Sequence, residues 1–374
     1  MDTHSDRALL DDILSGADVT LDGPDPWDIQ VRDPRFFRRV LAEGELGLGE
    51  SYMDGWWEAE QLDEMIARIL RAELDGKVAH AWPTRVRLAL AMLTNLQSRR
   101  RAFMVGERHY DLGNGLFSAM LDRRMNYSCG YWEGAHSLDE AQENKLDLLC
   151  CKLGLEPGMR VLDIGCGWGA FGKYAAERYG VEVVGITVSK EQVALGRRLC
   201  EGLPVELRLM DYRDLEGTFD RVVSVGMIEH VGTRNYRTYF EVAERCLAEG
   251  GLFLLHTIGA NRSSSSPSPW IDRYIFPNGK LPSIAQIGRA IEGLFVMEDW
   301  HGFGPDYDRT LLAWHDNVTA AWPALASRYD ERFRRMWSYY LLSCAGAFRA
   351  RHIQLWQVVL SKGGVPGGYR RVTS

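Results

Sequence analysis

A glycine-rich stretch near the middle of the chain is the clearest candidate for a ligand-binding loop. It reads Val161-Leu162-Asp163-Ile164-Gly165-Cys166-Gly167-Trp168-Gly169, an apolar segment followed by glycines at alternate positions. Glycine lets the backbone turn tightly and approach a ligand with no Cβ in the way. We expect a helix to begin at Ala170 and to direct its free N–H groups toward that ligand.

The spacing of this loop separates two classes of ligand. A dinucleotide site has the pattern G-x-G-x-x-G and an acidic residue about 20 residues further on, at the end of the second strand. Here position 170 is alanine, and the second strand is expected to end at Gly185-Ile186-Thr187-Val188-Ser189, without an acid. Asp163, just ahead of the glycines, can instead accept a hydrogen bond from the ammonium group of an amino acid. S-adenosylmethionine carries such a group and NAD does not, so the loop favours S-adenosylmethionine. The plainer interpretation of Asp163 is a turn residue or a helix N-cap.

The elements that would position the loop follow from alternating apolar and amphipathic segments. Strands are predicted at 160–164, 181–186, 205–210, 220–225 and 251–257, and helices at 169–179, 189–201 and 235–248. This alternation predicts an α/β fold with a doubly wound, mostly parallel sheet, which binds ligands at the carboxyl ends of its strands. Further along, helices are predicted at 283–294 and 317–350, and late strands at 292–300, 310–313 and 354–361.

The N-terminal part of the chain is predicted to be a separate, small and mainly helical domain, residues 1–83. Asp33-Pro34 suits the start of a helix, and the glycines between 44 and 49 are expected to end it. An amphipathic run follows through Leu62, Met65, Ile66 and Ile69.

Two features could bring the chain to a membrane surface. Trp56 and Trp57 are either core residues, the commoner role, or an interfacial pair that meets lipid headgroups. Residues 84–107 are predicted to form a basic linker helix that carries Arg99-Arg100-Arg101. A basic amphipathic helix can lie on an anionic membrane, although a solvated linker helix accounts for it equally well. The catalytic domain would then occupy residues 108–374.

Composition limits the class of protein further. A chain of 374 residues with 46% hydrophobic and 25% charged residues is typical of a soluble two-domain protein. A net charge of −7 argues against general nucleic-acid binding. The seven cysteines include no C-x-x-C pair, so we predict no metal site, and their odd number fits reduced thiols in the cytoplasm. No apolar run approaches the roughly 20 residues of a membrane-spanning helix.

Blocks of sequence on both sides of the glycine loop carry a resemblance to a known family. They are His109-Tyr110-Asp111-Leu112-Gly113-Asn114, Tyr127-Ser128-Cys129, Asp211-Tyr212-Arg213-Asp214, Gly226-Met227-Ile228-Glu229-His230-Val231-Gly232, Leu255-His256-Thr257-Ile258-Gly259, Tyr274-Ile275-Phe276-Pro277-Asn278-Gly279 and Phe303-Gly304-Pro305-Asp306-Tyr307-Asp308. With these blocks the chain resembles the cyclopropane-fatty-acyl-phospholipid synthases, relatives of the mycolic-acid cyclopropane synthases, whose sheet is of the Rossmann-like methyltransferase type.

The resemblance implies a reaction. The methyl group of S-adenosylmethionine is transferred to a cis double bond in an unsaturated phospholipid acyl chain, and a carbocation forms beside it. A base, in this family a bound bicarbonate, removes a proton from the new methyl group, and a cyclopropane ring closes. The resemblance also implies a cytoplasmic enzyme that contacts the inner face of the membrane. The N-terminal domain would dock on lipid and could pair two chains into a homodimer.

The resemblance also implies site residues. The catalytic shell around bicarbonate and the reacting carbons comprises Cys129, Glu229, His256, Ile258 and Tyr307. Cys129 and Ile258 would act mainly through their backbone, so Cys129 is not a covalent nucleophile. Contacts with S-adenosylmethionine are expected from Tyr127, Ser128, Asp163, Gly165, Gly167, Thr187, Gln192, Asp211 and Tyr212.

Other interpretations remain open at this point. Without the resemblance, His256 is a core histidine at a sheet edge, Glu229 caps a helix that starts near Thr233, and Tyr307 is a packing residue. Two other functions are alternatives: a methyltransferase of the same fold that makes a methyl-branched lipid or methylates a small molecule, and a non-catalytic lipid-binding protein.

Overall fold

The structure, a computed structural model, describes residues 3–73, 113–263 and 268–372. The chain divides into two compact units. The first consists of residues 1–94, 265–277 and 307–353, and the second of residues 95–264, 278–306 and 354–374. The predicted boundaries at 83 and 107, the basic helix between them and the block that starts at His109 fall largely outside the described residues.

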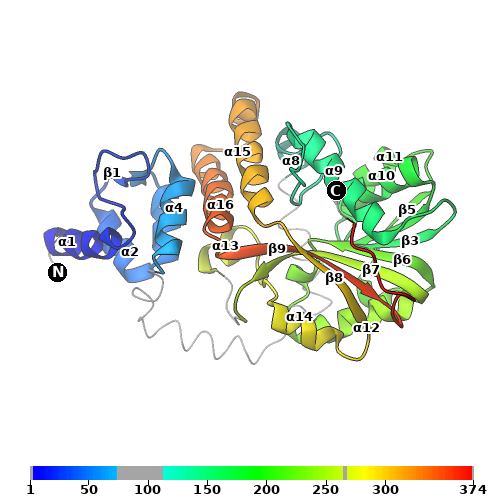
Figure 1. The fold of residues 1–374 in the computed structure, drawn as a ribbon. Coiled ribbons are helices and arrows are strands. Elements are labelled where there is room, and N and C mark those ends of the chain that lie inside the picture. The colour runs from blue at the N-terminus through cyan, green and yellow to red at the C-terminus, as the bar shows by residue number, and fades with distance from the viewer. Residues whose placement is uncertain (1–2, 74–112, 264–267, 373–374) are drawn as a thin grey trace. The chain divides into compact units, whose positions relative to one another are not determined.

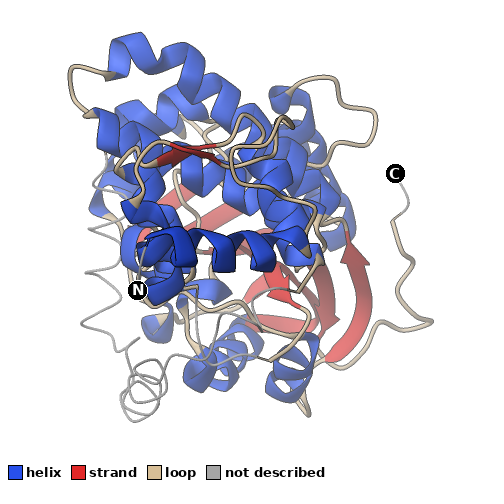
Figure 2. Cartoon of the chain, turned by 90° about the vertical axis from the view of Figure 1, so that its left-hand side faces the viewer, coloured by secondary structure: helices blue, strands red, loops and turns tan. Residues whose placement is uncertain are grey.

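A seven-stranded sheet with the order β5-β4-β3-β6-β7-β9-β8 is the framework of the second unit. Its strands are β3 (Arg160–Ile164), β4 (Glu182–Thr187), β5 (Val205–Leu209), β6 (Phe219–Val225), β7 (Leu247–Ala260), β8 (Val296–Gly302) and β9 (Ile353–Ser361). The strands from β5 to β7 pair in parallel, whereas β8 and β9 run antiparallel to each other. The predicted doubly wound, mostly parallel sheet is confirmed. Its strands, red in Figure 2, fan out with the twist expected of such a sheet.

Helices cover both faces of this sheet (Figure 1). One face carries α9 (Leu138–Leu153), α10 (Ala170–Tyr179) and α11 (Lys190–Leu199), and the other carries α12 (Tyr236–Cys246) and α14 (Ile284–Ile291). Successive residues of a strand point to opposite faces. On β3, Val161 therefore packs in the core cluster with α9 and α10, whereas Leu162 and Ile164 pack in the cluster with α12. Asp163, two residues after Val161, lies on the α9 face.

Shorter elements complete the second unit. They are α8 (Asn114–Met120) and the 3-10 helices η1 (Tyr212–Asp214), η2 (Ile228–His230) and η3 (Thr233–Asn235). η1 follows β5 and η2 follows β6, so both stand where parallel strands end and ligands bind.

The first unit is mainly helical, as predicted for its N-terminal part. Its helices are α1 (Thr3–Ser15), α2 (Arg35–Glu43), α3 (Glu45–Met53), α4 (Leu62–Arg71), α13 (Pro269–Tyr274), α15 (Pro305–Leu325) and α16 (Glu331–Arg349), with a short pair β1 (Gln30–Val31) and β2 (Trp57–Glu58). Gly44 does end α2, but Gly47 and Gly49 lie inside α3, so the prediction that they break a helix is wrong. They permit close packing instead: a Cβ on Gly49 would lie 2.4 Å from Trp270.

The prediction of a strand at 310–313 is also wrong, because this segment lies in α15. A short apolar run is compatible with either element when taken alone. The longer pattern is helical, since Tyr307, Leu311, Trp314 and Val318 are buried at spacings of three and four residues. The predicted helix 317–350 is two helices, and Asp330 caps the second by accepting a hydrogen bond from the Phe333 N–H at 2.8 Å.

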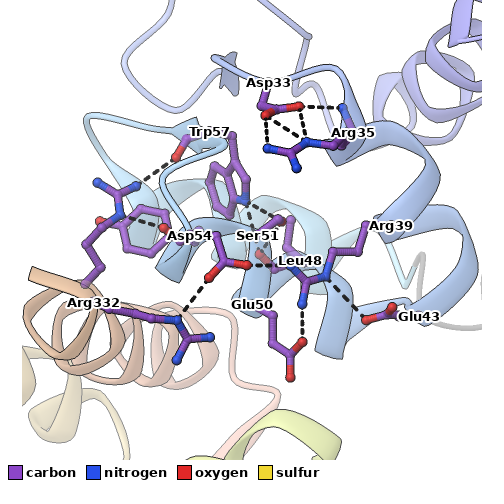
Figure 3. Close-up of polar contacts among 12 residues, drawn as sticks. Asp33, Arg35, Arg39, Glu43, Leu48, Glu50, Ser51, Asp54, Trp57 and Arg332 are labelled. Carbon is purple, nitrogen blue, oxygen red and sulfur yellow. Dashed lines mark hydrogen bonds and ion pairs between the residues drawn. The ribbon is translucent and has the colours of Figure 1, made fainter.

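A cluster of ion pairs connects α2, α3 and α16 (Figure 3). Arg39 pairs with Glu50, and its Nη1 lies 2.7 Å from Oδ2 of Asp54. The other oxygen of Asp54 lies 3.0 Å from Nε of Arg332. Glu50 is buried, and Arg39 supplies an opposite charge beside it. The N-terminal helices and α16 are therefore joined within one unit.

The two tryptophans have different surroundings. Trp57 is fully buried, and its Nε1 donates to the Leu48 carbonyl oxygen at 3.1 Å and to Oγ of Ser51 at 3.0 Å (Figure 3). Trp57 is therefore a core residue, and an interfacial role is wrong for it. Trp56 is partly exposed, and the guanidinium groups of Arg35 and Arg39 lie 4.5 Å and 5.0 Å from its ring centroid.

Candidate active site

The glycine loop connects β3 to α10 as predicted. Gly165, Gly167 and Gly169 all have positive φ, at 91°, 55° and 85°, a region that favours glycine. The N–H groups of Gly165 and Cys166 donate to the Ile186 carbonyl oxygen at 3.0 Å and 2.9 Å, which fixes the loop to the end of β4. A Cβ on Gly167 would meet no described atom within 4 Å. The backbone at Gly167 is thus open to a ligand.

Asp163 is a buried carboxyl group at the start of this loop. It lies in β3, is 2% exposed, and receives no hydrogen bond from the described residues. The N-cap of α10 is Gly169, so the interpretation of Asp163 as an N-cap or turn residue is wrong. Burial raises the pKa of Asp163 to about 7, against the opposing influence of Lys145. A buried carboxylate without partners is unfavourable, and the ammonium group of a ligand would relieve this.

Two more predicted cofactor residues lie just beyond β4 and β5 and are buried. Asp211 accepts from the Arg213 N–H through Oδ1 at 3.0 Å, while its Oδ2 has no partner among the described residues. Gln192, at the start of α11, accepts through Oε1 from the hydroxyl of Thr187 at 2.7 Å, so its amide N–H groups remain as donors. These atoms suit the amine of adenine and the hydroxyls of ribose, respectively.

Tyr212 has a different place from its neighbour Asp211. Its ring packs edge-on against Tyr239, with centroids 5.6 Å apart, inside the core cluster on the α12 face. The Tyr212 ring is therefore a core element. A contact between Tyr212 and adenine stays a prediction.

The Tyr127-Ser128-Cys129 segment is held by a buried polar face of α9. Nζ of Lys145 donates to Oγ of Ser128 at 3.0 Å and to Oδ1 of Asn126 at 2.9 Å. Nε2 of Gln142 donates to the Ser128 carbonyl oxygen at 2.7 Å. Burial lowers the pKa of Lys145 to about 8. Lys145 and Gln142 thus fix the backbone on which the predicted residues lie.

Glu229 lies in η2, directly after β6. Its Oε1 accepts from the Ile258 N–H at 2.8 Å, and its Oε2 has no partner among the described residues. Because α12 begins at Tyr236 without a side-chain cap, the interpretation of Glu229 as a helix cap is wrong. Burial raises the pKa of Glu229 to about 7. Its carboxyl group can therefore change charge near neutral pH.

His256 lies within β7, opposite Val225, inside the segment 251–257 that was predicted as a strand. Its Nδ1 is 3.3 Å from Nε2 of Gln357, and its own Nε2 has no partner among the described residues. Burial and the charges of Lys145 and Lys152 hold the pKa of His256 well below its usual range. The imidazole is therefore neutral at physiological pH.

Ile258 completes a linked group of three residues. It lies two positions after His256 on β7, so the two side chains share one face, and its N–H is bound to Glu229. The structure thus brings Glu229, His256 and Ile258 together.

The remaining two predicted catalytic residues differ in their surroundings. Cys129 is fully buried, and its Sγ donates to the Gly130 carbonyl oxygen at 3.1 Å, an arrangement that does not activate a nucleophile. Tyr307 belongs to the first unit, where its ring stacks on Phe348 with centroids 4.5 Å apart. The catalytic roles of both residues stay predictions.

Sequence reasoning missed three buried polar residues near these groups: Gln142, Lys145 and Gln357. Gln142 occurs at helical spacing with Leu146, Leu149 and Leu153, which face the core. A polar residue in an apolar stripe was therefore a usable signal for Gln142. Gln357, in contrast, interrupts an apolar strand, and the sequence does not show which strand lies beside it.

The comparisons with known proteins decide the family. Residues 97–358 match the family model described as mycolic acid cyclopropane synthetase. The chain belongs to this family. It is 56% identical over 362 residues to the cyclopropane-fatty-acyl-phospholipid synthase of Escherichia coli K12, covering 97% of this chain and 94% of that protein. It is 35% identical over 364 residues to a probable fatty acid methyltransferase of Pseudomonas putida, covering 91% of this chain and 88% of that protein.

Solved structures agree with this assignment. The cyclopropane synthase MmaA2 of Mycobacterium tuberculosis superposes with a TM-score of 0.67 at 31% identity, covering 72% of this chain and all of that one. The mycolic acid cyclopropane synthase CmaA1, solved with SAH and CTAB, superposes with a TM-score of 0.65 at 34% identity, covering 70% and 98%. The resemblance seen in the sequence blocks and the methyltransferase fold are both confirmed, and the chain is an enzyme of this S-adenosylmethionine-dependent family.

Proposed function

We propose that this enzyme transfers a methylene group from S-adenosylmethionine to a cis double bond of an unsaturated phospholipid acyl chain and so forms a cyclopropane ring. The observation that carries the proposal is the buried group of Glu229, Ile258 and His256, in which Oε2 of Glu229 and Nε2 of His256 lack partners among the described residues. The 56% identity to the Escherichia coli synthase supports this choice of substrate.

The chemistry sets the demands on the site. The π electrons of the double bond form a C–C bond to the methyl carbon as its bond to sulfur breaks, which leaves a cation on the neighbouring carbon. A base then takes a proton from the new methyl group, and the electron pair of that C–H bond closes the ring. No strong nucleophile is needed, so the enzyme must orient the reactants, exclude water, stabilise a cation and hold one base.

Glu229 and His256 match the last two demands. A Glu229 carboxylate stabilises positive charge nearby, and burial strengthens that effect because the local dielectric is low. A neutral His256 N–H can donate to an anion, which suits bicarbonate as the base. The Ile258 N–H already donates to Glu229, so it supports the carboxylate and would not bind bicarbonate at the same time. Backbone donors from Cys129 and the hydroxyl of Tyr307 would complete this shell.

The residues of the second unit fit S-adenosylmethionine. The buried Asp163 carboxyl group would receive the ammonium group of the methionine part beside Gly165 and Gly167, where the backbone is open. Oδ2 of Asp211, which has no partner in the described part of the chain, would accept from the adenine amine, and Gln192 with Thr187 would contact the ribose. Tyr127 and Ser128, held by α9, would close over the methionine part.

The product of a defined reaction tests the proposal. Purified enzyme is incubated with S-adenosylmethionine and liposomes that contain cis-unsaturated phospholipid. We expect the acyl chains to gain the mass of one CH₂, and NMR of the product to show cyclopropane protons with loss of vinyl signals. Removal of bicarbonate from the buffer should lower the rate, and its return should restore it. A methyl or methylidene product would instead make the enzyme a lipid methyltransferase, and failure to bind S-adenosylmethionine would leave a non-catalytic lipid-binding protein.

We also propose that the enzyme is cytoplasmic and works at the inner face of the membrane, with the N-terminal helices as the docking region. Its substrate is a membrane lipid, and the described part of the chain contains no helix long and apolar enough to span a bilayer. A homodimer, formed through the N-terminal region, would present two docking regions at once. Sedimentation of the purified enzyme tests the pairing.

A further inference from the structure

We propose that Gln357 is a positioning residue that fixes His256 in the neutral tautomer with its proton on Nε2. The reaction itself assigns no role to Gln357, because its side chain contacts Nδ1 of His256 and not Nε2, the nitrogen proposed to bind the base. The inference rests on the proposed function in one respect: the value of the tautomer lies in binding an anionic base.

The contact is buried and isolated. Gln357 is fully buried and His256 is 1% exposed. Nε2 of Gln357 lies 3.3 Å from Nδ1 of His256. They stand on β9 and β7, which are neighbours in the sheet. Both side chains lie on the α9 face, since Leu254 and Val359, two residues from each, pack in the cluster on that face.

An amide nitrogen can only donate, so in this arrangement Nδ1 of His256 must accept, and the proton of the neutral ring must lie on Nε2. The opposite orientation of the amide would place Oε1 against a protonated Nδ1. That orientation would put both N–H bonds of the amide where Oε1 now lies, away from the ring, whereas the observed one uses one N–H for Nδ1 and leaves Oε1 without a partner among the described residues. Buried N–H groups without acceptors are rarer than carbonyl oxygens without donors. The observed orientation is therefore the favoured one.

The charges around His256 preserve this state. Among the described residues, Lys145 and Lys152, both on α9, act on the ring through their charges, and both oppose a second proton. The imidazole thus stays neutral and carries a single proton, on either Nδ1 or Nε2. Without Gln357 that proton could occupy either nitrogen.

The tautomer decides what the free nitrogen can do. With the proton on Nε2, this nitrogen, which lacks a partner among the described residues, is a donor and can hold bicarbonate or another small anion. With the proton on Nδ1, Nε2 carries a lone pair instead of a proton, and this lone pair repels an anion. Gln357 would therefore control whether His256 binds the base or excludes it.

NMR of the full-length enzyme reads the tautomer directly. The enzyme is labelled with ¹⁵N in its histidines, and two-bond ¹H–¹⁵N correlations are recorded without substrate at pH 7.5. The His256 signals are assigned from their absence in His256→Gln. We expect the pattern of a neutral ring with its proton on Nε2. A proton on Nδ1, or a doubly protonated ring, would overturn the proposal even if the enzyme makes cyclopropane lipids.

Two variants of similar size then separate hydrogen bonding from packing. Gln357→Glu supplies only an acceptor when ionised, so it should draw the proton to Nδ1 and raise the histidine pKa, which moves the acid limb of the pH–rate profile upward. Gln357→Met supplies neither donor nor acceptor and should yield a mixture of tautomers. We expect kcat to fall about 10-fold to 100-fold, by analogy with the range seen when the partners that orient metal-binding histidines are removed. KM for S-adenosylmethionine should stay within about twofold.

Val359→Ala is the matched control, because it loosens the same face of β9 two residues further along without touching the hydrogen bond. It should lower the melting temperature but leave the tautomer pattern and kcat within about twofold of wild type. If both Gln357 variants keep the wild-type tautomer and kcat, Gln357 has no positioning role. If the wild-type enzyme shows the expected tautomer but forms no cyclopropane product, the proposed function fails while the tautomer assignment stands.

Discussion

We expect the charge of Asp163 to couple the binding of S-adenosylmethionine to pH. Burial raises the folded-state pKa of Asp163 from 3.8 to about 7, so below pH 7 the free enzyme holds this group protonated. The ammonium group of S-adenosylmethionine favours the ionised form. Binding below pH 7 must then release a proton, and the dissociation constant should rise by up to about tenfold for each pH unit below 7. Above pH 7 it should be flat.

Calorimetry in two buffers with different ionisation enthalpies measures that proton release. Asp163→Asn is the control, since it should bind more weakly at every pH and lose most of the dependence on pH. An affinity that is constant from pH 5.5 to 7.5, with no proton release, would contradict a contact between Asp163 and the ammonium group.

The charge state of a second single residue, Glu229, should affect both activity and stability. Its folded-state pKa of about 7 lies above the usual value of 4.5, so the stability that its proton contributes is full below pH 4.5 and is lost as pH rises through 7. Glu229→Gln keeps an oxygen acceptor for the Ile258 N–H but never ionises. At pH 8 this variant should be more stable than wild type by about 3 kcal/mol, on the scale of 1.4 kcal/mol per pKa unit.

The same substitution should abolish most of the turnover, because the uncharged amide cannot stabilise a cation, while affinity for S-adenosylmethionine changes little. Denaturant unfolding at pH 4.5 and 8, initial rates and calorimetry provide the three measurements. Equal losses in turnover and cofactor affinity would argue against a position of Glu229 near the acceptor. A stability gain that is the same at both pH values would show that its carboxyl group does not titrate near 7.

At the scale of elements, α9 supports the loop that carries Ser128. Lys145→Met removes the donors to Ser128 and Asn126 and leaves their oxygens without that partner in a buried site. Each oxygen left unpaired costs about 1–3 kcal/mol, so we expect a loss of about 3 kcal/mol in the free energy of unfolding and weaker binding of S-adenosylmethionine. Urea unfolding and calorimetry measure the two effects.

Lys173→Met is the matched control on the neighbouring helix α10. Its ammonium group is only partly buried and lies 3.9 Å from Glu177, a pair of the kind worth about 0.5 kcal/mol or less. The control should change neither stability nor binding by more than that amount. If both variants behave alike, the buried face of α9 does not support the loop.

Elements were predictable from the sequence where their information is local. The alternation of apolar strands and amphipathic helices from residue 160 to 257 matches the sheet closely, because each period reports the burial of its own segment. Segment 310–313 was misassigned because four residues are too few to distinguish a strand from a helix. Segment 47–49 was misassigned because a partner far along the chain decides it: Gly49 is helical since α3 packs closely on Trp270. The site residues divide in the same way between local and distant information. The glycine loop at Gly165 could be predicted from its own sequence, whereas the contact of Gln357 with His256 depends on β7, which lies beside β9 in the sheet.

At the scale of the whole molecule, the proposed substrate is a lipid that is held in a bilayer. The chain as a whole is acidic, with a net charge of −7, and an anionic membrane repels such a protein on average. Docking therefore requires a local basic region. Arg99-Arg100-Arg101 is the densest basic run in the sequence, and it lies outside the described residues.

We expect the triple substitution of these arginines by glutamine to weaken binding to liposomes that contain anionic lipid. A basic residue near such a surface contributes about 1 kcal/mol, so the loss should reach about tenfold to 100-fold in the partition coefficient at low salt. The difference should vanish near 1 M salt, where the screening length is about 3 Å. Co-sedimentation with liposomes over a range of salt concentrations measures it.

A second triple variant separates local from overall charge. Arg178, Arg198 and Arg289 are exposed residues of the second unit, and their replacement by glutamine changes the net charge by the same amount. This control should keep most of the liposome binding, and both variants should bind S-adenosylmethionine like wild type. If the two variants lose liposome binding equally, only the overall charge matters. If neither loses it, docking depends on apolar contacts, and the partly exposed Trp56 between Arg35 and Arg39 becomes the next side chain to replace, since an aromatic ring flanked by cations suits the headgroup region.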